Sequence, residues 1–121
     1  MGLFDLTDLV LQRGLQGASL RQQLLSNNFA NANTAGFKRS DVDFESALGA
    51  ALSSSDPSRA VADATFSPQT DTTSSMSADG NNVDLDQELS GLTENSVEYQ
   101  SLAAIERSRL QMLQNAMGGT P

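Results

Sequence analysis

The 121-residue sequence predicts a mainly α protein whose two long terminal helices pack as an antiparallel, coiled-coil-like pair. Three observations support this prediction. Apolar residues recur in alternating steps of four and three near both ends, this periodicity disappears over residues 53–78, and helix start and stop signals flank the periodic stretches. We also expect a short third helix and an irregular or partly disordered middle, which leaves room for a small β-hairpin.

The amino-terminal helix is expected from about residue 5 to residue 33. Its apolar register is typical of helices that pack lengthwise on one another. Two interior glycines, Gly14 and Gly17, weaken this helix in isolation, because each costs about 1 kcal/mol relative to alanine. They indicate either a close approach of another helix or a local bend. The candidate packing residues in this register are Leu11, Leu15, Leu25 and Phe29.

An asparagine-rich stretch over residues 26–36 ends the first helix, since asparagine tolerates left-handed backbone and Gly36 adopts a positive φ without steric cost. A Ser-x-x-Asp signal then begins at Ser40 and predicts a short helix over about residues 41–52. Serine, threonine, aspartate and proline dominate residues 53–78, so we expect a loop or disordered insert there. The predicted segments are therefore 1–52, 53–78 and 79–121, which together form one structural domain.

The carboxy-terminal helix is expected over residues 84–117. A turn at Asp79 and Gly80 precedes it, Asp84 is the expected N-cap, and Gln87 stands at the third helical position. At about 1.5 Å per residue the helix spans roughly 50 Å, so its natural partner in the chain is the amino-terminal helix. The candidate packing residues in its register are Leu85, Leu89, Leu92, Tyr99, Leu110 and Leu113.

The composition excludes several kinds of chemistry. There is no cysteine and no histidine, so no thiolate or imidazole is available for catalysis or for zinc binding. The net charge of −8 argues against a nucleic-acid binder. Residues 79–88 invite comparison with a calcium loop, but the required glycine and glutamate positions hold Asp84 and Ser90. We therefore expect neither enzyme activity nor a metal or cofactor.

The apolar residues are few in total yet concentrated at the two ends. Hydrophobic residues make up 38% of the chain, against roughly 45–50% in ordinary globular domains. Both terminal helices nevertheless carry apolar residues outside their registers, among them Leu20, Val97 and Ile105. The two registers could form an ordinary intramolecular hairpin core. The surplus favours additional packing on other copies or other chains.

Two segments resemble a known family. Residues 26–39, Ser-Asn-Asn-Phe-Ala-Asn-Ala-Asn-Thr-Ala-Gly-Phe-Lys-Arg, resemble the amino-terminal signature of the bacterial flagellar axial proteins, which are the rod, hook and hook-associated components. Residues 79–88, with Tyr99 and Gln100 downstream, look like the carboxy-terminal half of a short proximal rod component. The resemblance covers about residues 3–52 and 79–117, and it departs at Ala35, where the family often has proline. It implies a structural role, namely ending the first helix and fixing a turn on which neighbours pack, for Asn31, Asn33, Thr34, Gly36 and Phe37.

The resemblance also implies the setting in which the protein works. It would be a structural subunit of the basal-body rod, the drive shaft that transmits torque for motility. It would be exported by the flagellar type III apparatus without a cleavable signal peptide and assemble in the periplasm. The implied partners are other copies of itself, other rod proteins, the basal-body adaptor FliE, the membrane ring and the export gate, with no nucleic acid and no transmembrane segment of its own. The alternatives are another short rod component and a soluble helical chaperone or adaptor of the export system.

Overall fold

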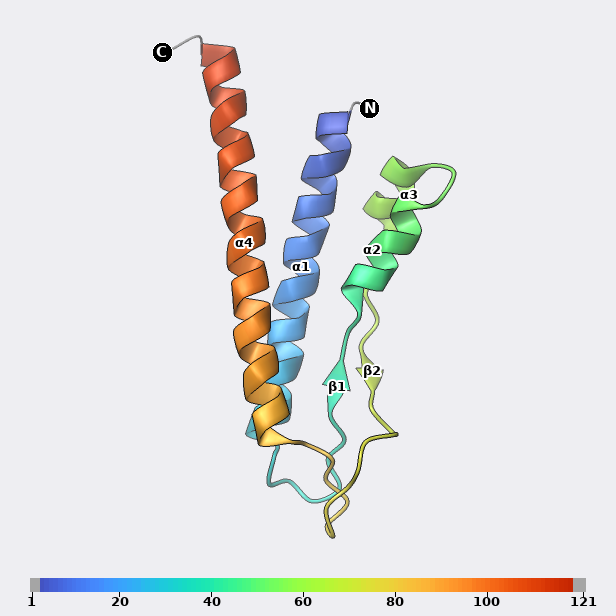
Figure 1. The fold of residues 1–121 in the computed structure, drawn as a ribbon. Coiled ribbons are helices and arrows are strands. Elements are labelled where there is room, and N and C mark those ends of the chain that lie inside the picture. Colours follow the sequence, from blue (N-terminus) through green and yellow to red (C-terminus); the bar gives the residue numbers. More distant parts are fainter. Residues whose placement is uncertain (1–2, 119–121) are drawn as a thin grey trace.

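The computed structural model describes residues 3–118. Its elements are α1 (Leu3–Ala30), β1 (Ser40–Asp41), α2 (Phe44–Leu52), α3 (Pro57–Asp63), β2 (Gln69–Thr70) and α4 (Leu85–Gly118). Figure 1 shows α1 between the antiparallel α4 on one side and an arm made of α2 and α3 on the other. The prediction of a mainly α protein with two long terminal helices side by side is confirmed.

Small residues allow α1 and α4 to approach each other closely. A Cβ added at Gly14 would lie 3.3 Å from a methyl carbon of Leu102, and one added at Gly91 would lie 3.3 Å from Leu25. On α1 the residues turned inward are spaced by three or four, as lengthwise packing requires. Of the two readings of the α1 glycines, a close approach of another element is therefore the one that the structure supports.

The apolar core lies on the other face of α1, under the arm. It consists of Ala18, Val42, Phe44, Leu48, Ala51 and Val61, all less than 9% exposed. Gly17 makes room for this packing, because a Cβ there would lie 2.3 Å from the Phe44 ring. The rings of Phe44 and Phe66 meet edge to face at 6.0 Å. The arm thus covers an α1 face that α4 does not reach.

The short second helix begins later than predicted. Its N-cap is Asp43, whose carboxylate accepts a hydrogen bond from the backbone N–H of Ser46 at 3.1 Å. Ser40 and Asp41, expected at the helix start, instead form β1 and pair antiparallel with Thr70 and Gln69 of β2. The small sheet was expected as a hairpin within the middle, whereas its first strand lies before α2.

Residues 53–78 contain more regular structure than expected. The prediction of an irregular segment is wrong for α3 and β2. Asp56 caps α3, Pro57 occupies its first turn, and Val61 is completely buried against the core of the arm. The segment orders because α1 supplies the apolar surface that its own composition lacks. The division of the chain at residues 52 and 78 stays a prediction. Among residues 3–118, no helix is long and apolar enough to span a membrane.

Candidate assembly interface

The two segments that resemble the flagellar axial proteins interlock at one end of the helix pair. Gly36 (φ +74°) and Gly80 (φ +84°) both have left-handed backbone, which glycine adopts without strain. The N–H of Gly36 donates to the carbonyl of Asp79 at 2.9 Å, and a Cβ at Gly80 would lie 3.5 Å from the Gly36 Cα. The turn after α1 and the turn before α4 therefore form one unit, and the predicted turn residues Gly36, Asp79 and Gly80 lie together.

Two buried asparagines, which the sequence reasoning missed, fasten these turns. Asn81 is 1% exposed, and its Nδ2 donates to the carbonyls of Asn31 and Thr34 at 2.9 and 2.8 Å. Asn82 is 5% exposed and accepts a hydrogen bond from the N–H of Arg39 at 2.7 Å. Their side chains bond to backbone groups of the segment after α1 and so tie that segment to the turn before α4. The only available signal was the pair of adjacent asparagines between a glycine turn and a helix cap.

The other predicted turn residues lie around this unit. Asn33 and Thr34 are exposed, and Phe37 is half-buried. Asn31 bonds locally, with its Oδ1 accepting a hydrogen bond from the Thr34 hydroxyl at 3.1 Å. Asp84 stands before α4, where its carboxylate accepts hydrogen bonds from the N–H groups of Asp86 and Gln87 at 3.0 and 3.2 Å. Asp79 thus stabilises the turn and Asp84 caps the start of α4, and no group of three potential metal ligands occurs within residues 3–118.

A buried ion pair beside the turns connects α4 to the residue that precedes β1. Glu88 is fully buried, Arg39 is 7% exposed, and Oε1 of the glutamate lies 2.5 Å from Nε of the arginine. Asn28 of α1 donates to the other carboxylate oxygen at 3.1 Å and exchanges hydrogen bonds of 2.8 and 2.9 Å with the backbone of Ser40. The partner carboxylates, chiefly that of Glu88 through its hydrogen bond, raise the pKa of Arg39, which therefore stays charged. Nothing in the sequence pattern distinguished Glu88 from an ordinary first-turn acid.

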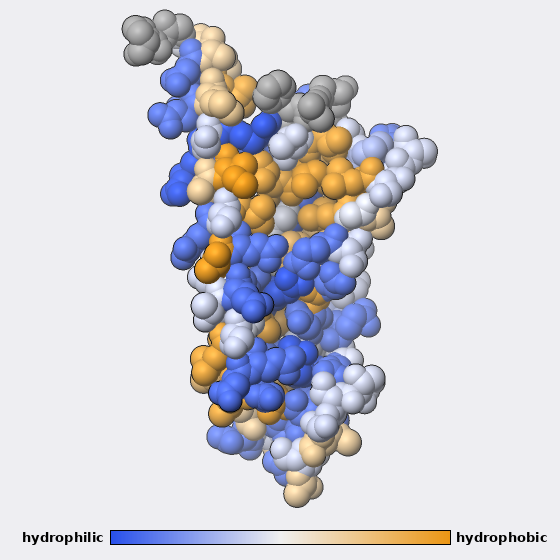
Figure 2. Space-filling model, in the orientation of Figure 1, coloured by the Kyte–Doolittle hydropathy of each residue, from blue (hydrophilic) through white to orange (hydrophobic). Residues whose placement is uncertain are grey.

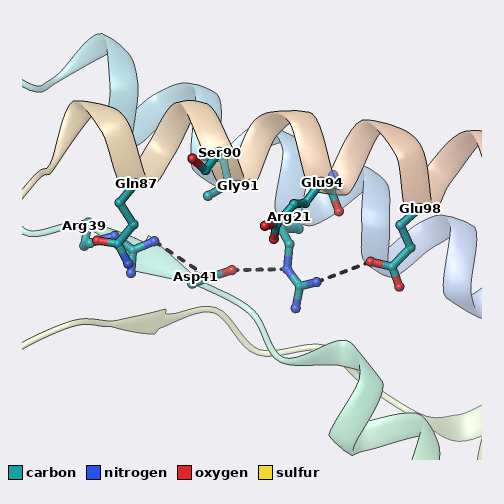
Figure 3. Close-up of a pocket in the computed structure, with 10 residues that line it drawn as sticks. Arg21, Arg39, Asp41, Gln87, Ser90, Gly91, Glu94 and Glu98 are labelled. Carbon is teal, nitrogen blue, oxygen red and sulfur yellow. Dashed lines mark hydrogen bonds and ion pairs between the residues drawn. The ribbon is translucent and has the colours of Figure 1, made fainter.

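A second cluster surrounds Arg21 of α1. Its guanidinium lies 2.5 Å from a carboxylate oxygen of Glu45, 3.3 Å from Asp41 and 3.8 Å from Glu98. Figure 3 shows Arg21 between Asp41 and Glu98, with Arg39 on the far side of Asp41. The guanidinium also lies over the Phe44 ring at 4.6 Å. Burial, and then the neighbouring charge of Glu45, raise the pKa of Glu98. This cluster joins α1, α4 and the arm.

Five of the six predicted α4 packing residues are exposed and do not pack on α1 within the single chain, and the sixth, Leu92, is half-buried. The side of α4 turned toward α1 is displaced by one residue from the predicted register, so that Glu88 faces α1 in place of Leu89, and Asn95 and Leu102 follow at steps of seven. The displacement occurs because α1 offers partners for polar groups. Nδ2 of Asn95, for example, donates to the Ala18 carbonyl at 2.8 Å. Of the candidate packing residues on α1, Leu11 and Leu25 are buried, Leu15 is half-buried, and Phe29 is 40% exposed.

Most of the predicted α4 register is instead exposed to solvent, and we call these residues the α4 stripe. Apart from the half-buried Leu92, the large apolar members are 38–85% exposed, and with Leu92 they follow one another along the helix in steps of three, four, seven or eleven residues. Figure 2 shows apolar side chains at intervals along α4, besides the apolar area where α1 meets the arm. A row of this kind in a small protein indicates contact with another molecule. The exposed stripe residues are Leu85, Leu89, Tyr99, Leu110, Leu113 and Met117.

Comparisons with known proteins agree on one family. Residues 9–38, which cover most of α1 and the following turn, match the family model described as flagella basal body rod protein. The chain is 32% identical to the flagellar basal body rod protein FlgB of Salmonella typhimurium, over 89% of this chain and 90% of that protein. It is 33% identical to FlgB of Aeromonas hydrophila, over 96% of both chains, and 28% identical to FlgB of Bacillus subtilis, over 98% of both.

Proposed function

The chain belongs to the FlgB family of flagellar basal body rod proteins, and from this premise we propose how its surfaces build the rod. As a member of this family it is a structural component of the proximal rod and has no catalytic role. We propose that the α4 stripe packs against neighbouring rod subunits and that copies joined in this way transmit torque as part of the drive shaft.

The observation that carries this proposal is that α4 turns polar side chains toward α1 and a row of apolar side chains toward solvent. Its inner face uses Glu88 and Asn95 to bind α1 and the turn unit, while the leucines of the stripe are exposed to solvent. Burying apolar surface is worth about 25 cal/mol per Å², so covering the stripe on assembly would stabilise contact between subunits substantially. Helices that lie lengthwise against one another also resist shear between subunits, which is what a rotating shaft requires.

The partners and the location extend this proposal. Other copies and other rod proteins are the proposed neighbours of the stripe. The adaptor FliE, the membrane ring and the export gate are proposed at the base of the rod, in the periplasm, with export through the flagellar type III apparatus. The exposed Asn33 and Thr34 of the interlocked turns offer hydrogen-bonding groups to a neighbour. What supports these proposals is the family membership together with the exposure of these residues.

Substitutions in the stripe test the proposal. Leu89 and Leu110 are 49% and 50% exposed, so Leu89→Asp or Leu110→Asp should leave the helical circular dichroism of the purified chain almost unchanged. In cells lacking the native gene, either variant should be exported but absent from isolated basal bodies, and the cells should be non-motile. Ser101→Asp is the matched control, because Ser101 is exposed on the same helix and lies outside the stripe. Motile cells carrying Leu89→Asp or Leu110→Asp would overturn the proposal.

A further inference from the structure

One base of the chain has no partner among residues 3–118. All seven bases lie in the described part, and six of them make hydrogen bonds or ion pairs there. Arg107, the seventh, is exposed on α4 and makes no hydrogen bond or ion pair with any residue from 3 to 118. An exposed arginine on a helix that already carries an apolar stripe is suited to contacts between subunits, where arginine is enriched.

The same helix borders a groove that has an excess of hydrogen-bond acceptors. Arg21 and Leu25 of α1 line it, together with Asp41 and with Glu94 and Glu98 of α4. Figure 3 shows the carboxylates of Asp41 and Glu98 on either side of Arg21. Both arginines of the groove are already engaged, Arg39 by Glu88 and Arg21 chiefly by Glu45. Glu94 is exposed, and no residue from 3 to 118 gives it a hydrogen bond or ion pair. The groove therefore carries more negative charge than its own arginines neutralise.

A buried side chain that lines this groove adds a further hydrogen-bond acceptor. Asn95 lines the groove and is 3% exposed. Its Nδ2 bonds Ala18 and Gln22, while its Oδ1 is buried and has no hydrogen-bond partner among the described residues. A buried amide oxygen without a donor is rare and costly. The groups of the groove that have no partner within residues 3–118, the Glu94 carboxylate and Oδ1 of Asn95, are thus both hydrogen-bond acceptors. A guanidinium, which has five N–H donors, is suited to bind them.

The arginine and the groove cannot meet within one chain. Arg107 lies nine residues beyond Glu98, which places it about 180° around the helix and about 14 Å further along its axis. Relative to Glu94 the separation along the axis is about 20 Å. Contacts between two different surfaces of the same protein generate rings or helical tubes, whereas contacts between identical surfaces close into dimers.

We propose that Arg107 of one copy inserts into the groove lined by Glu94 and Glu98 of the next copy, joining rod subunits head to tail with an axial stagger of about 14–20 Å. This inference rests on the proposed function and adds to it the direction and offset of the contact. Charge complementarity within a single sequence is the reason for assigning the groove to a second copy. The apolar stripe supplies the contact area, and the ion pair fixes which surfaces meet.

A charge exchange tests the proposal in assembled rods. We expect Arg107→Glu and Glu94→Arg each to lower the amount of chain in isolated basal bodies by about tenfold or more, and the two together to restore most of it. Neither residue has a hydrogen bond or ion pair with the described part of its own chain, so the fold should be retained, as circular dichroism would check. Arg59→Glu is the matched control, since Arg59 is exposed on α3, and its incorporation should equal that of the parent. Normal incorporation of Arg107→Glu, or a double variant no better than the single ones, would overturn the proposal.

Crosslinking gives an independent readout, because the chain has no cysteine. In rods mixed from Glu94→Cys and Arg107→Cys copies, a short bismaleimide should link the two kinds of copy, while either variant alone should give no dimer. Dimers from one variant alone, or no link in mixed rods, would overturn the head-to-tail contact. The failure of the proposed function is distinguishable, because Leu89→Asp and Leu110→Asp would then incorporate normally.

Discussion

The buried pair of Arg39 and Glu88 makes a quantitative prediction about the stability of the single chain. Glu88→Leu removes the carboxylate that neutralises a guanidinium only 7% exposed, and it deprives Asn28 of one acceptor. Asp41 and Asp71 lie 3.7 Å from the same guanidinium and compensate only in part, because both are more exposed than Glu88. Breaking a buried pair on one side costs about 3–5 kcal/mol.

The size of the expected effect makes it readily measurable. For a chain of this length 1 kcal/mol corresponds to about 4 °C in melting temperature, so Glu88→Leu should lower it by about 12–20 °C. Arg39→Met should destabilise in the same direction, because it leaves the fully buried Glu88 carboxylate unpaired. The double variant Glu88→Leu with Arg39→Met buries no charge at this site, so we expect it to be more stable than either single variant by about 2 kcal/mol.

Urea unfolding followed by circular dichroism at constant pH and salt measures all four free energies of the cycle. The urea dependence of the free energy should stay constant across the variants, since the surface exposed on unfolding hardly changes. The reasoning would be refuted if Glu88→Leu lay within about 0.5 kcal/mol of the parent, the range of ordinary surface substitutions. It would also be refuted if the two single losses simply added in the double variant, because coupled partners do not add.

Three further predictions concern single contacts. Gly17→Ala would place a methyl group 2.3 Å from the Phe44 ring, so we expect the free energy of unfolding to fall by about 1–3 kcal/mol despite the better helix propensity of alanine. Gly14→Ala is the control, because its methyl group would meet only the end of the Leu102 side chain at 3.3 Å and should cost much less. Equal melting temperatures of the two variants would contradict this prediction. Asn81→Ala removes two hydrogen bonds that join the turns after α1 and before α4, and at about 0.5–1.5 kcal/mol each this should cost about 1–3 kcal/mol and speed amide exchange there. Unchanged protection would argue against the fastening role. The hydrogen bond from the Ser74 hydroxyl, and after it the bonds from backbone N–H groups, lower the pKa of Asp71 below its unfolded value of about 3.9. The stability that this carboxylate contributes is therefore present above that pH and is lost as the pH falls toward the folded pKa. The urea midpoint of Asp71→Asn should decline less steeply below about pH 4 than that of the parent, and identical pH dependence of the two midpoints would exclude the effect.

The sequence was sufficient to predict that two long helices pack side by side. It was not sufficient to predict which face of α4 contacts α1. Period and caps located α1 and α4 to within a few residues, since these signals are local. Which face of α4 meets α1 depends on distant partners, such as the Ala18 carbonyl that bonds Asn95 and the Arg39 that pairs with Glu88. A register read from leucines assumes that the apolar face is the inner one, and that assumption failed here.

The missed helix α3 illustrates a different limit. Asp56 followed by Pro57 is a recognisable helix start, but seven residues are too few for a periodic pattern. The stability of this helix comes from one residue, Val61, which is completely buried in the core of the arm. Composition averaged over residues 53–78 could not reveal that a single side chain has a place in another element's packing.

The low apolar content of the chain has a consistent explanation in the arrangement of its surfaces. The inner faces of the helix pair are joined largely by small and polar residues, and those polar contacts, such as Glu88 with Arg39 and Asn28, are specific in geometry and modest in net stabilisation. Leucines placed there would stabilise the monomer more, but they would then be unavailable to a neighbouring subunit. A sequence that keeps its leucines for the α4 stripe should give a marginally stable monomer and an assembly stabilised chiefly by contacts between subunits. Polar contacts within the chain and apolar contacts between subunits suit a protein that is made as separate copies and then assembled into a stiff shaft.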